Sequence, residues 1–170
     1  MEDRLDEIEA DILKILHSLP LSVLEGGWKS DRTWTSELKL KIGLLGKNHG
    51  YYICASGWGL PDGQGEWLYD LVWLSIRGQS IVDVPLVLES EWAIDLKNID
   101  EDFSKLLLAR AQHRVMIFQQ RTLSDVEKVF DFLSNQISVF SRSQPGDRYL
   151  LTGLNWTDNQ TFSHRLVIAR

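Results

Sequence analysis

Three carboxylates on neighbouring predicted strands are the residues whose types and spacing best fit chemistry. Asp70 interrupts an otherwise apolar run, and Glu89 and Glu91 stand two positions apart in the next run. Side chains two apart on a strand point to the same face, about 7 Å from each other. A buried ionised carboxylate is costly unless an opposite charge or a metal ion compensates it. One Asp and two Glu therefore predict a site for Mg²⁺ or Mn²⁺, which take oxygen ligands.

The same three carboxylates also have a purely structural interpretation. Glu89 and Glu91 would then mark the end of a strand that reaches solvent, and Asp70 would pair with an arginine. The three residues by themselves do not decide between the two interpretations.

Hydrophobic periodicity and turn chemistry predict the elements that position these carboxylates. Helices are predicted over residues 2–18, 34–47, 101–112 and 124–140. Strands are predicted over residues 51–55, 66–76, 85–92, 114–118, 148–156 and 161–169, with turns at 59–63 and 158–159. Pro20 is expected to end the first helix, Pro85 to begin the third strand, and Asp100 to cap the third helix. Residues 124–127 match a capping box for the fourth helix.

The order of these elements, ααβββαβαββ, contains no internal repeat and no linker. A chain of 170 residues is the size of one ordinary domain. The predicted fold class is therefore α/β, a single domain over residues 1–170 with a mixed central β-sheet flanked by helices.

A helix, three strands with carboxylates on the second and third, then a helix and a fourth strand resembles the PD-(D/E)XK superfamily of restriction-endonuclease-like nucleases. The resemblance covers roughly residues 34–118. It implies a restriction-endonuclease-like core preceded by an N-terminal amphipathic helix (1–20) and followed by an added helix and hairpin (122–170). In that superfamily an Asp on the second core strand and a Glu-x-Lys on the third bind the metal and activate water.

The resemblance gives each candidate residue a role. Asp70 takes the Asp position, Glu89 takes the first acidic position of the pair, and Glu91 stands where Lys is usual. Some members of the family have Glu at this place, and others carry the lysine on the following helix, where Lys105 lies. Glu37, on the predicted helix before the first strand, resembles an accessory acidic residue of many members. The implied activity is that of a Mg²⁺-dependent endonuclease that hydrolyses DNA phosphodiester bonds.

Other interpretations stay open at this point. Lys105 lies four residues after Glu101, which is the favourable order for a surface ion pair on a helix. The missing lysine of Glu-x-Lys and the acidic first helix favour a nuclease-fold module that no longer cleaves and instead binds protein or nucleic acid. A small protein-binding domain that shares only the α/β layout is a third hypothesis. Gln119 and Gln120 would either reach the site or simply end a strand.

Charge and composition limit the classes of partner that we expect for this chain. The net charge is −6, but residues 1–11 alone contribute −5, so the rest of the chain allows DNA as a partner. The single Cys54 excludes a disulfide framework. No apolar run approaches the ~20 residues that a membrane span needs, and the acidic N-terminus lacks the pattern of a signal peptide. We therefore expect no membrane partner and a cytoplasmic location.

The first predicted helix has an apolar stripe and a strongly acidic outer face. The stripe is expected to dock on this domain or on a second copy of the chain. A homodimer or a protein partner is therefore compatible with the sequence.

Overall fold

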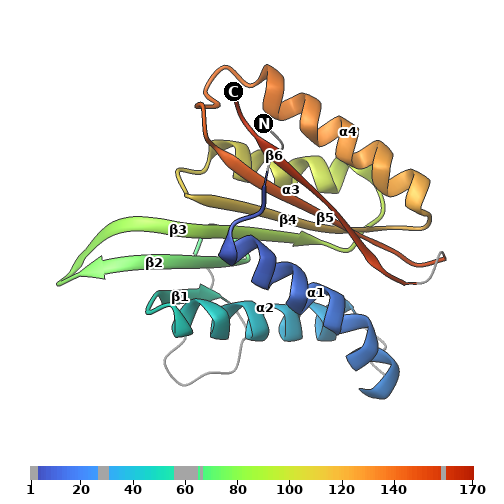
Figure 1. Cartoon of the computed structure of the whole chain (residues 1–170), viewed down its shortest axis with the longest axis horizontal. Coiled ribbons are helices and arrows are strands. Elements are labelled where there is room, and N and C mark those ends of the chain that lie inside the picture. The colour runs from blue at the N-terminus through green and yellow to red at the C-terminus, as the bar shows by residue number, and fades with distance from the viewer. Residues whose placement is uncertain (1–3, 27–30, 56–64, 66, 158–159) are drawn as a thin grey trace.

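Six strands form one mixed sheet, and two pairs of helices cover its two faces (Figure 1). The computed structural model describes residues 4–26, 31–55, 65, 67–157 and 160–170. The helices are α1 (Glu7–Gly26), α2 (Asp31–Asn48), α3 (Leu96–Leu108) and α4 (Leu123–Val139). The strands are β1 (Tyr52–Ala55), β2 (Leu71–Arg77), β3 (Ser80–Glu91), β4 (His113–Gln120), β5 (Arg148–Asn155) and β6 (Phe162–Ile168). The prediction of a single α/β domain with a mixed sheet between helices is confirmed.

The strands lie in the sheet in the order of the chain, β1 to β6. The neighbours β1–β2, β2–β3 and β5–β6 are antiparallel, whereas β3–β4 and β4–β5 are parallel. The parallel strands are joined through α3 and α4, as a crossover connection requires. The carboxyl ends of β3, β4 and β5 therefore meet at one edge of the sheet, which is where α/β folds place their ligands. The start of β2 lies at the same edge, because β2 runs antiparallel to β3.

Alternation along the strands sends neighbouring residues into two separate cores. Leu86 and Leu88 of β3 pack into the core that α1 and α2 cover. Val87 packs into the other core, with residues of α3 and α4. Figure 1 shows the two helix pairs on opposite sides of the sheet, α1 and α2 below it and α3 and α4 above it. Glu89, two positions after Val87, consequently faces α3.

The second strand begins five residues later than predicted, at Leu71 instead of residue 66. The Tyr69 N–H donates to the Trp67 carbonyl oxygen at 2.8 Å, and Leu68 between them has φ of 66°. This tight turn breaks the extended run, so Asp70 lies on the segment entering β2 and not inside an apolar strand. The predicted environment of Asp70 is corrected accordingly.

The third strand is longer than predicted, and Pro85 lies inside it. β3 begins at Ser80, and its pairing with β2 shifts register between Trp73 and Ser75. Trp73 pairs with Leu86 and Ser75 pairs with Asp83, so Pro85 occupies the irregular stretch. A residue without an amide hydrogen is tolerated there, because the ladder is already interrupted.

Two helix caps differ from the predicted ones. Asp95 and not Asp100 caps α3, and its side chain accepts from the N–H groups of Lys97 (3.0 Å) and Asn98 (3.2 Å). Asp100 instead accepts a hydrogen bond from Gln136 of α4. Thr122, two residues before the predicted capping box, caps α4 by accepting from the N–H of Asp125 at 3.2 Å. The sequence offers several capping residues near each helix start, so local patterns alone do not select among them.

The first helix is shifted relative to its prediction. It begins at Glu7 and continues past Pro20 to Gly26. Its apolar residues Ile12 and Leu16 are 0% exposed, so the predicted docking on this domain is confirmed. Glu9, expected on the acidic outer face, is also 0% exposed. No helix in the described ranges is both long enough and apolar enough to cross a membrane. The predicted turns at 59–63 and 158–159 lie outside the described residues.

Candidate functional site

Glu89 is the most deeply buried of the predicted site residues. It is 2% exposed, and the Nζ of Lys105 on α3 lies 3.3 Å from its Oε1 as an ion pair. Burial and the nearby charge of Asp70 raise the pKa of Glu89 to about 8, although Lys105 acts in the opposite direction. The ionised form of Glu89 is therefore disfavoured in the folded protein, and a further cation near the carboxyl group would favour it.

Lys105 projects toward Glu89 and does not pair with Glu101. Its Nζ also lies 2.7 Å from Asp102 Oδ1, whereas Glu101 pairs with Lys97 at 3.7 Å. Burial tends to lower the pKa of Lys105, but the hydrogen bond to Asp102 and the charge of Glu89 outweigh it and raise the pKa. The alternative prediction, a surface ion pair between Lys105 and Glu101, is therefore wrong. Lys105 instead brings a positive charge to the end of β3.

Asp70 is held by two neighbours that the sequence did not single out. Its Oδ2 accepts from both the N–H and the hydroxyl of Ser90, each at 2.8 Å. Its Oδ1 lies 3.0 Å from the Nζ of Lys39, a residue of α2 whose side chain is 5% exposed. The partner of Asp70 is therefore a lysine and not the arginine of the structural interpretation. One sequence signal was present, because Lys39 stands beside the apolar stripe of α2 formed by Leu38 and Ile42.

Glu91 lies on β3 with Glu89, and Glu37 lies on α2 with Lys39. Glu91 Oε1 accepts from the N–H of Ala93 at 2.6 Å, which stabilises the turn after β3. Glu37 is half-buried on α2, two residues before Lys39. Both residues are close in sequence to the charged groups of the site, but neither is joined to Asp70 or Glu89 by a hydrogen bond or ion pair among the described residues.

Asp70 and Glu89 are neighbours at one end of the β2–β3 pair, and each has its own cationic partner. Asp70 is bound by Ser90 of β3 and Lys39 of α2, whereas Glu89 is bound by Lys105 of α3. Among the described residues, the ligand atoms of Asp6, Glu9 and His113 lie within 4.8 Å of one another, which is close enough to hold a metal ion. Asp70, Glu89 and Glu91 do not form such a group. The site thus consists of two ion pairs, Asp70–Lys39 and Glu89–Lys105, whose carboxylates repel each other.

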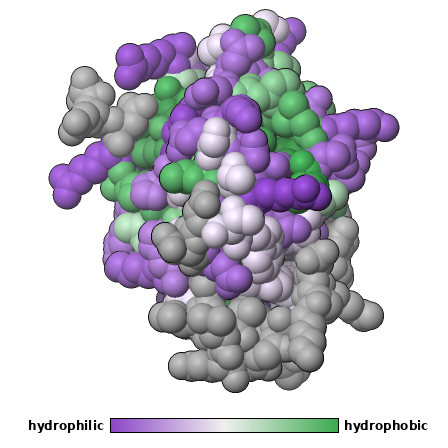
Figure 2. All heavy atoms as spheres, turned by 90° about the vertical axis from the view of Figure 1, so that its right-hand side faces the viewer, coloured by the Kyte–Doolittle hydropathy of each residue, from purple (hydrophilic) through white to green (hydrophobic). Residues whose placement is uncertain are grey.

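Side chains of β4 hold the backbone that follows Glu91. Gln119 donates to the carbonyl oxygen of Trp92, and Gln120 donates to that of Ile94 at 2.9 Å. Trp156 in turn donates to the side-chain oxygen of Gln119. The two glutamines therefore position the end of β3 and do not themselves reach the carboxylates. Figure 2 shows this end of the molecule, where hydrophilic side chains separate several hydrophobic areas of the described surface.

The group that does meet metal-ligand spacing is already saturated by protein donors. Arg148 donates to both carboxylate oxygens of Glu9, from Nη2 at 2.5 Å and from Nε at 2.8 Å. His113 has Asp6 Oδ2 2.7 Å from its Nε2 and the Pro85 carbonyl oxygen 2.9 Å from its Nδ1. Both ring nitrogens thus face acceptors, and a guanidinium occupies the place that a cation would take. We interpret Asp6, Glu9, His113 and Arg148 as an ion-pair network that fixes the start of α1, and we call it the α1 anchor.

The sequence contained one signal of the α1 anchor that was missed. Asp6 and Glu9 form a reciprocal capping pair, because each side chain accepts from the other's backbone N–H at 3.0 Å. A first turn that begins with such a pair indicates a helix start at residue 6 or 7. The partner Arg148, 139 positions away, has no signal at the level of spacing.

Comparison with known proteins adds no relative to this picture. No family model, no curated protein and no solved structure matches the chain. The function is therefore argued from the geometry of the site itself.

Proposed function

We propose that this chain is a metal-dependent nuclease that hydrolyses DNA phosphodiester bonds, with a restriction-endonuclease-like core. The observation that carries the proposal is Glu89, a buried carboxyl whose pKa is raised to about 8 beside Asp70. Two acidic groups from adjacent strands that repel each other are stabilised by a shared cation. Their oxygens are the ligands that Mg²⁺ and Mn²⁺ take, so the donor set fits such an ion.

The order of elements around these residues supports the same proposal. A helix (α2), three strands (β1 to β3), a helix (α3) and a fourth strand (β4) follow one another, as the resemblance implies. Asp70 enters the second of these strands and Glu89 lies near the end of the third. Lys105 on the following helix reaches Glu89, which is the position expected for a lysine that has moved from the third strand.

Each side chain then has a separate task. Asp70 and Glu89 would hold the ion, and a bound divalent cation would polarise the scissile phosphate and lower the pKa of its water. Glu91 would either add an oxygen ligand or accept a proton from the attacking water, since among the described residues its hydrogen bond is to Oε1, from Ala93. Lys105 would balance the charge of the phosphate, and Lys39 would hold the Asp70 carboxylate in place before the ion binds.

Cleavage assays with matched variants test the proposal. Single- and double-stranded DNA are incubated with Mg²⁺ or Mn²⁺ and with wild type, Asp70→Asn, Glu89→Gln or Lys105→Ala. We expect each variant to lose cleavage by about two orders of magnitude or more. The control is Lys97→Ala, which removes a lysine from the same helix whose side chain is 82% exposed, and it should cleave like wild type. A wild type that cleaves neither substrate and binds no metal in calorimetry contradicts the proposal.

One observation favours a second function, a nuclease-fold module that binds without cleaving. Lys39, with a side chain 5% exposed, already neutralises Asp70 from within the protein. An internal ammonium in that place makes a metal ion unnecessary for folding. Replacing Lys39 by Met distinguishes the two functions. In a nuclease the variant retains metal binding at Asp70 and Glu89, whereas in a binding module it only destabilises the fold.

A further inference from the structure

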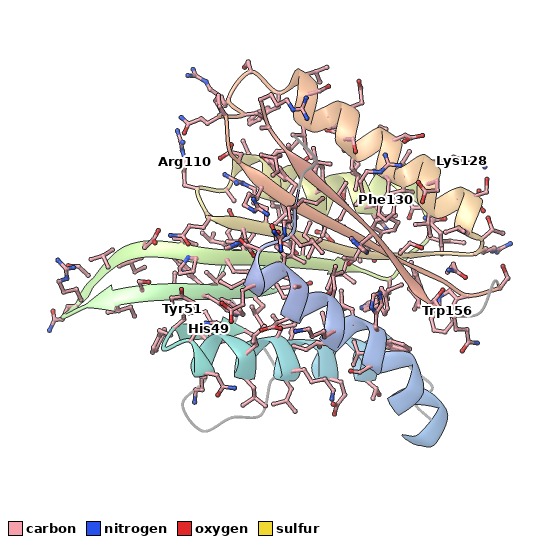
Figure 3. All side chains as sticks on the ribbon, viewed as in Figure 1. His49, Tyr51, Arg110, Lys128, Phe130 and Trp156 are labelled. Carbon is pink, nitrogen blue, oxygen red and sulfur yellow. The ribbon has the colours of Figure 1, made fainter. Side chains whose placement is uncertain are left out.

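A polar cavity lies at the C-terminal ends of α3 and α4. Its volume is about 300 Å³, and three of its lining residues are Arg110, Arg114 and Arg142. We call it the arginine pocket. None of Asp70, Glu89, Glu91 and Lys105 lines it. Figure 3 shows Arg110 at the upper left and Trp156, which donates to Gln119 near the end of β3, at the lower right.

Arg114 is held rigidly at the base of this pocket. It is 3% exposed, and its Nε and Nη2 donate to the Ala109 carbonyl oxygen at 3.2 and 2.9 Å. Its Nη2 also lies 3.1 Å from Asp147 Oδ1, and its guanidinium stacks 4.9 Å from the centre of the Tyr149 ring. A guanidinium fixed in this way is pre-organised for a further acceptor.

One nitrogen of this guanidinium lacks a partner. Arg114 Nη1 is buried and has no hydrogen bond within the part of the chain that the structure describes. Capping of α3 at Ala109 explains the roles of Nε and Nη2 but leaves Nη1 without an acceptor. An unsatisfied buried donor destabilises the folded chain, so an external acceptor would stabilise it.

The charge of the pocket indicates which acceptor. Asp147, the one acidic residue among the described residues that line the pocket, is engaged by Arg114 and by the Gln144 N–H at 2.9 Å. Arg110 and Arg142 are exposed and form no ion pair with any described residue. Three guanidiniums against one carboxylate leave a net charge of +2. A terminal phosphate carries about −1.5 to −2 and three acceptor oxygens, whereas a carboxylate or a backbone phosphodiester carries a single charge.

We propose that the arginine pocket binds a terminal phosphate group, that of inorganic phosphate or of a phosphomonoester. Arg114 Nη1 donates from the base, and Arg110 and Arg142 enclose the phosphate from the surface. Phe140, which also lines the pocket, provides an apolar wall for the group that carries the phosphate. The volume is at the lower end of the range for small-ligand sites, which is roughly 300–1,000 Å³. This proposal does not rest on the nuclease proposal.

Calorimetric titration with inorganic phosphate tests the pocket. Wild type, Arg110→Ala and Arg142→Ala are compared with Arg77→Ala, which removes another exposed arginine, from the end of β2. We expect phosphate to bind the wild type and Arg77→Ala equally, and each pocket variant to bind about tenfold more weakly. Chloride and acetate at the same ionic strength should give no comparable heat, because a screening effect does not depend on the anion.

Three results would overturn the proposal. They are phosphate binding no stronger than acetate binding, equal weakening by Arg77→Ala and Arg142→Ala, and unchanged binding in both pocket variants. Short oligonucleotides with a 5′-phosphate or a 5′-hydroxyl identify the source of the group. Tighter binding of the phosphorylated form, lost in Arg142→Ala, assigns the pocket to phosphorylated ends. Binding of inorganic phosphate without this difference assigns it to small phosphomonoesters.

Discussion

Glu9 on α1 and Glu89 on β3 are both almost completely buried, at 0% and 2% exposure, yet their surroundings differ. Glu9 receives two hydrogen bonds from the Arg148 guanidinium and one from the backbone of Asp6. Glu89 has one ion pair with a half-exposed lysine and lies beside another carboxylate. The first environment compensates a negative charge within the protein, and the second leaves it partly uncompensated.

This difference indicates that Glu9 has a structural role, whereas the charge of Glu89 does not stabilise the fold. Breaking a buried ion pair that is fully hydrogen-bonded strongly destabilises the folded protein. A carboxyl whose ionised form is disfavoured in the folded state lowers the stability of that state, so its presence calls for a functional explanation. The same chemical substitution at the two positions is therefore expected to have opposite effects on stability.

The largest effect is expected for Glu9→Gln. The amide cannot balance the Arg148 guanidinium, and its NH₂ group faces a donor, so we expect a loss of about 3 kcal/mol in the free energy of unfolding. Urea denaturation at pH 7 measures it. The control, Glu101→Gln, removes a carboxylate that is 65% exposed and should change stability by less than about 0.5 kcal/mol. A Glu9→Gln variant as stable as the control would remove the contrast between the two glutamates.

The next effect, of opposite sign, is expected for Glu89→Gln. The folded-state pKa is raised from 4.5 to about 8, so ionisation of Glu89 destabilises the fold progressively from pH 4.5 upward and fully above pH 8. Without added metal, Glu89→Gln should therefore stabilise the protein at pH 9 by on the order of 3 kcal/mol and leave it unchanged at pH 4. Urea denaturation across this pH range measures the difference. A destabilised variant at pH 9 would mean that Lys105 compensates Glu89 completely.

A smaller effect with an acidic pH dependence is expected for Asp6→Asn. Burial tends to raise the pKa of Asp6, but the Glu9 backbone N–H and His113 lower it below 3.8 overall. The stabilisation is then present above pH 3.8 and is lost as the pH falls through the folded-state pKa. Because the side chain is 39% exposed, solvent screens the effect, and we expect a loss below about 1 kcal/mol at pH 7. The melting temperatures of wild type and Asp6→Asn should converge in acid. A difference in melting temperature that is constant at all pH values would contradict the role of the Asp6 charge.

The smallest change in stability is expected for Lys105→Ala, because Lys105 is about half exposed and also contacts Asp102. Its effect on Glu89 should be larger, since Lys105 lowers the pKa of that carboxyl. We expect the pKa of Glu89 to rise above its value of about 8, measured by the carboxyl resonance in NMR titration. Lys97→Ala should leave the titration unchanged. An equal shift in both variants would indicate a general charge effect of the helix.

The α/β class and the order of helices and strands were predictable from local patterns, because hydrophobic periodicity and turn residues act over a few positions. The neighbourhood of Asp70 and Glu89 was predictable too, since antiparallel strands joined by a short turn must place their ends together. Element boundaries were less predictable. The turn at Leu68 and the caps Asp95 and Thr122 are formed by bonds within a few residues, and the sequence offers equally good local alternatives beside them.

What the sequence by itself determined is therefore the layout of the domain and the place where its carboxylates gather. Only the tertiary structure decided which charges are compensated. Lys39 reaches Asp70 and Arg148 reaches Glu9 because α1 and α2 pack on one face of the sheet, across 31 and 139 positions of the chain. Ion pairs of that separation leave no periodic signal, since their energy depends on burial and on distances that exist only after the cores have formed.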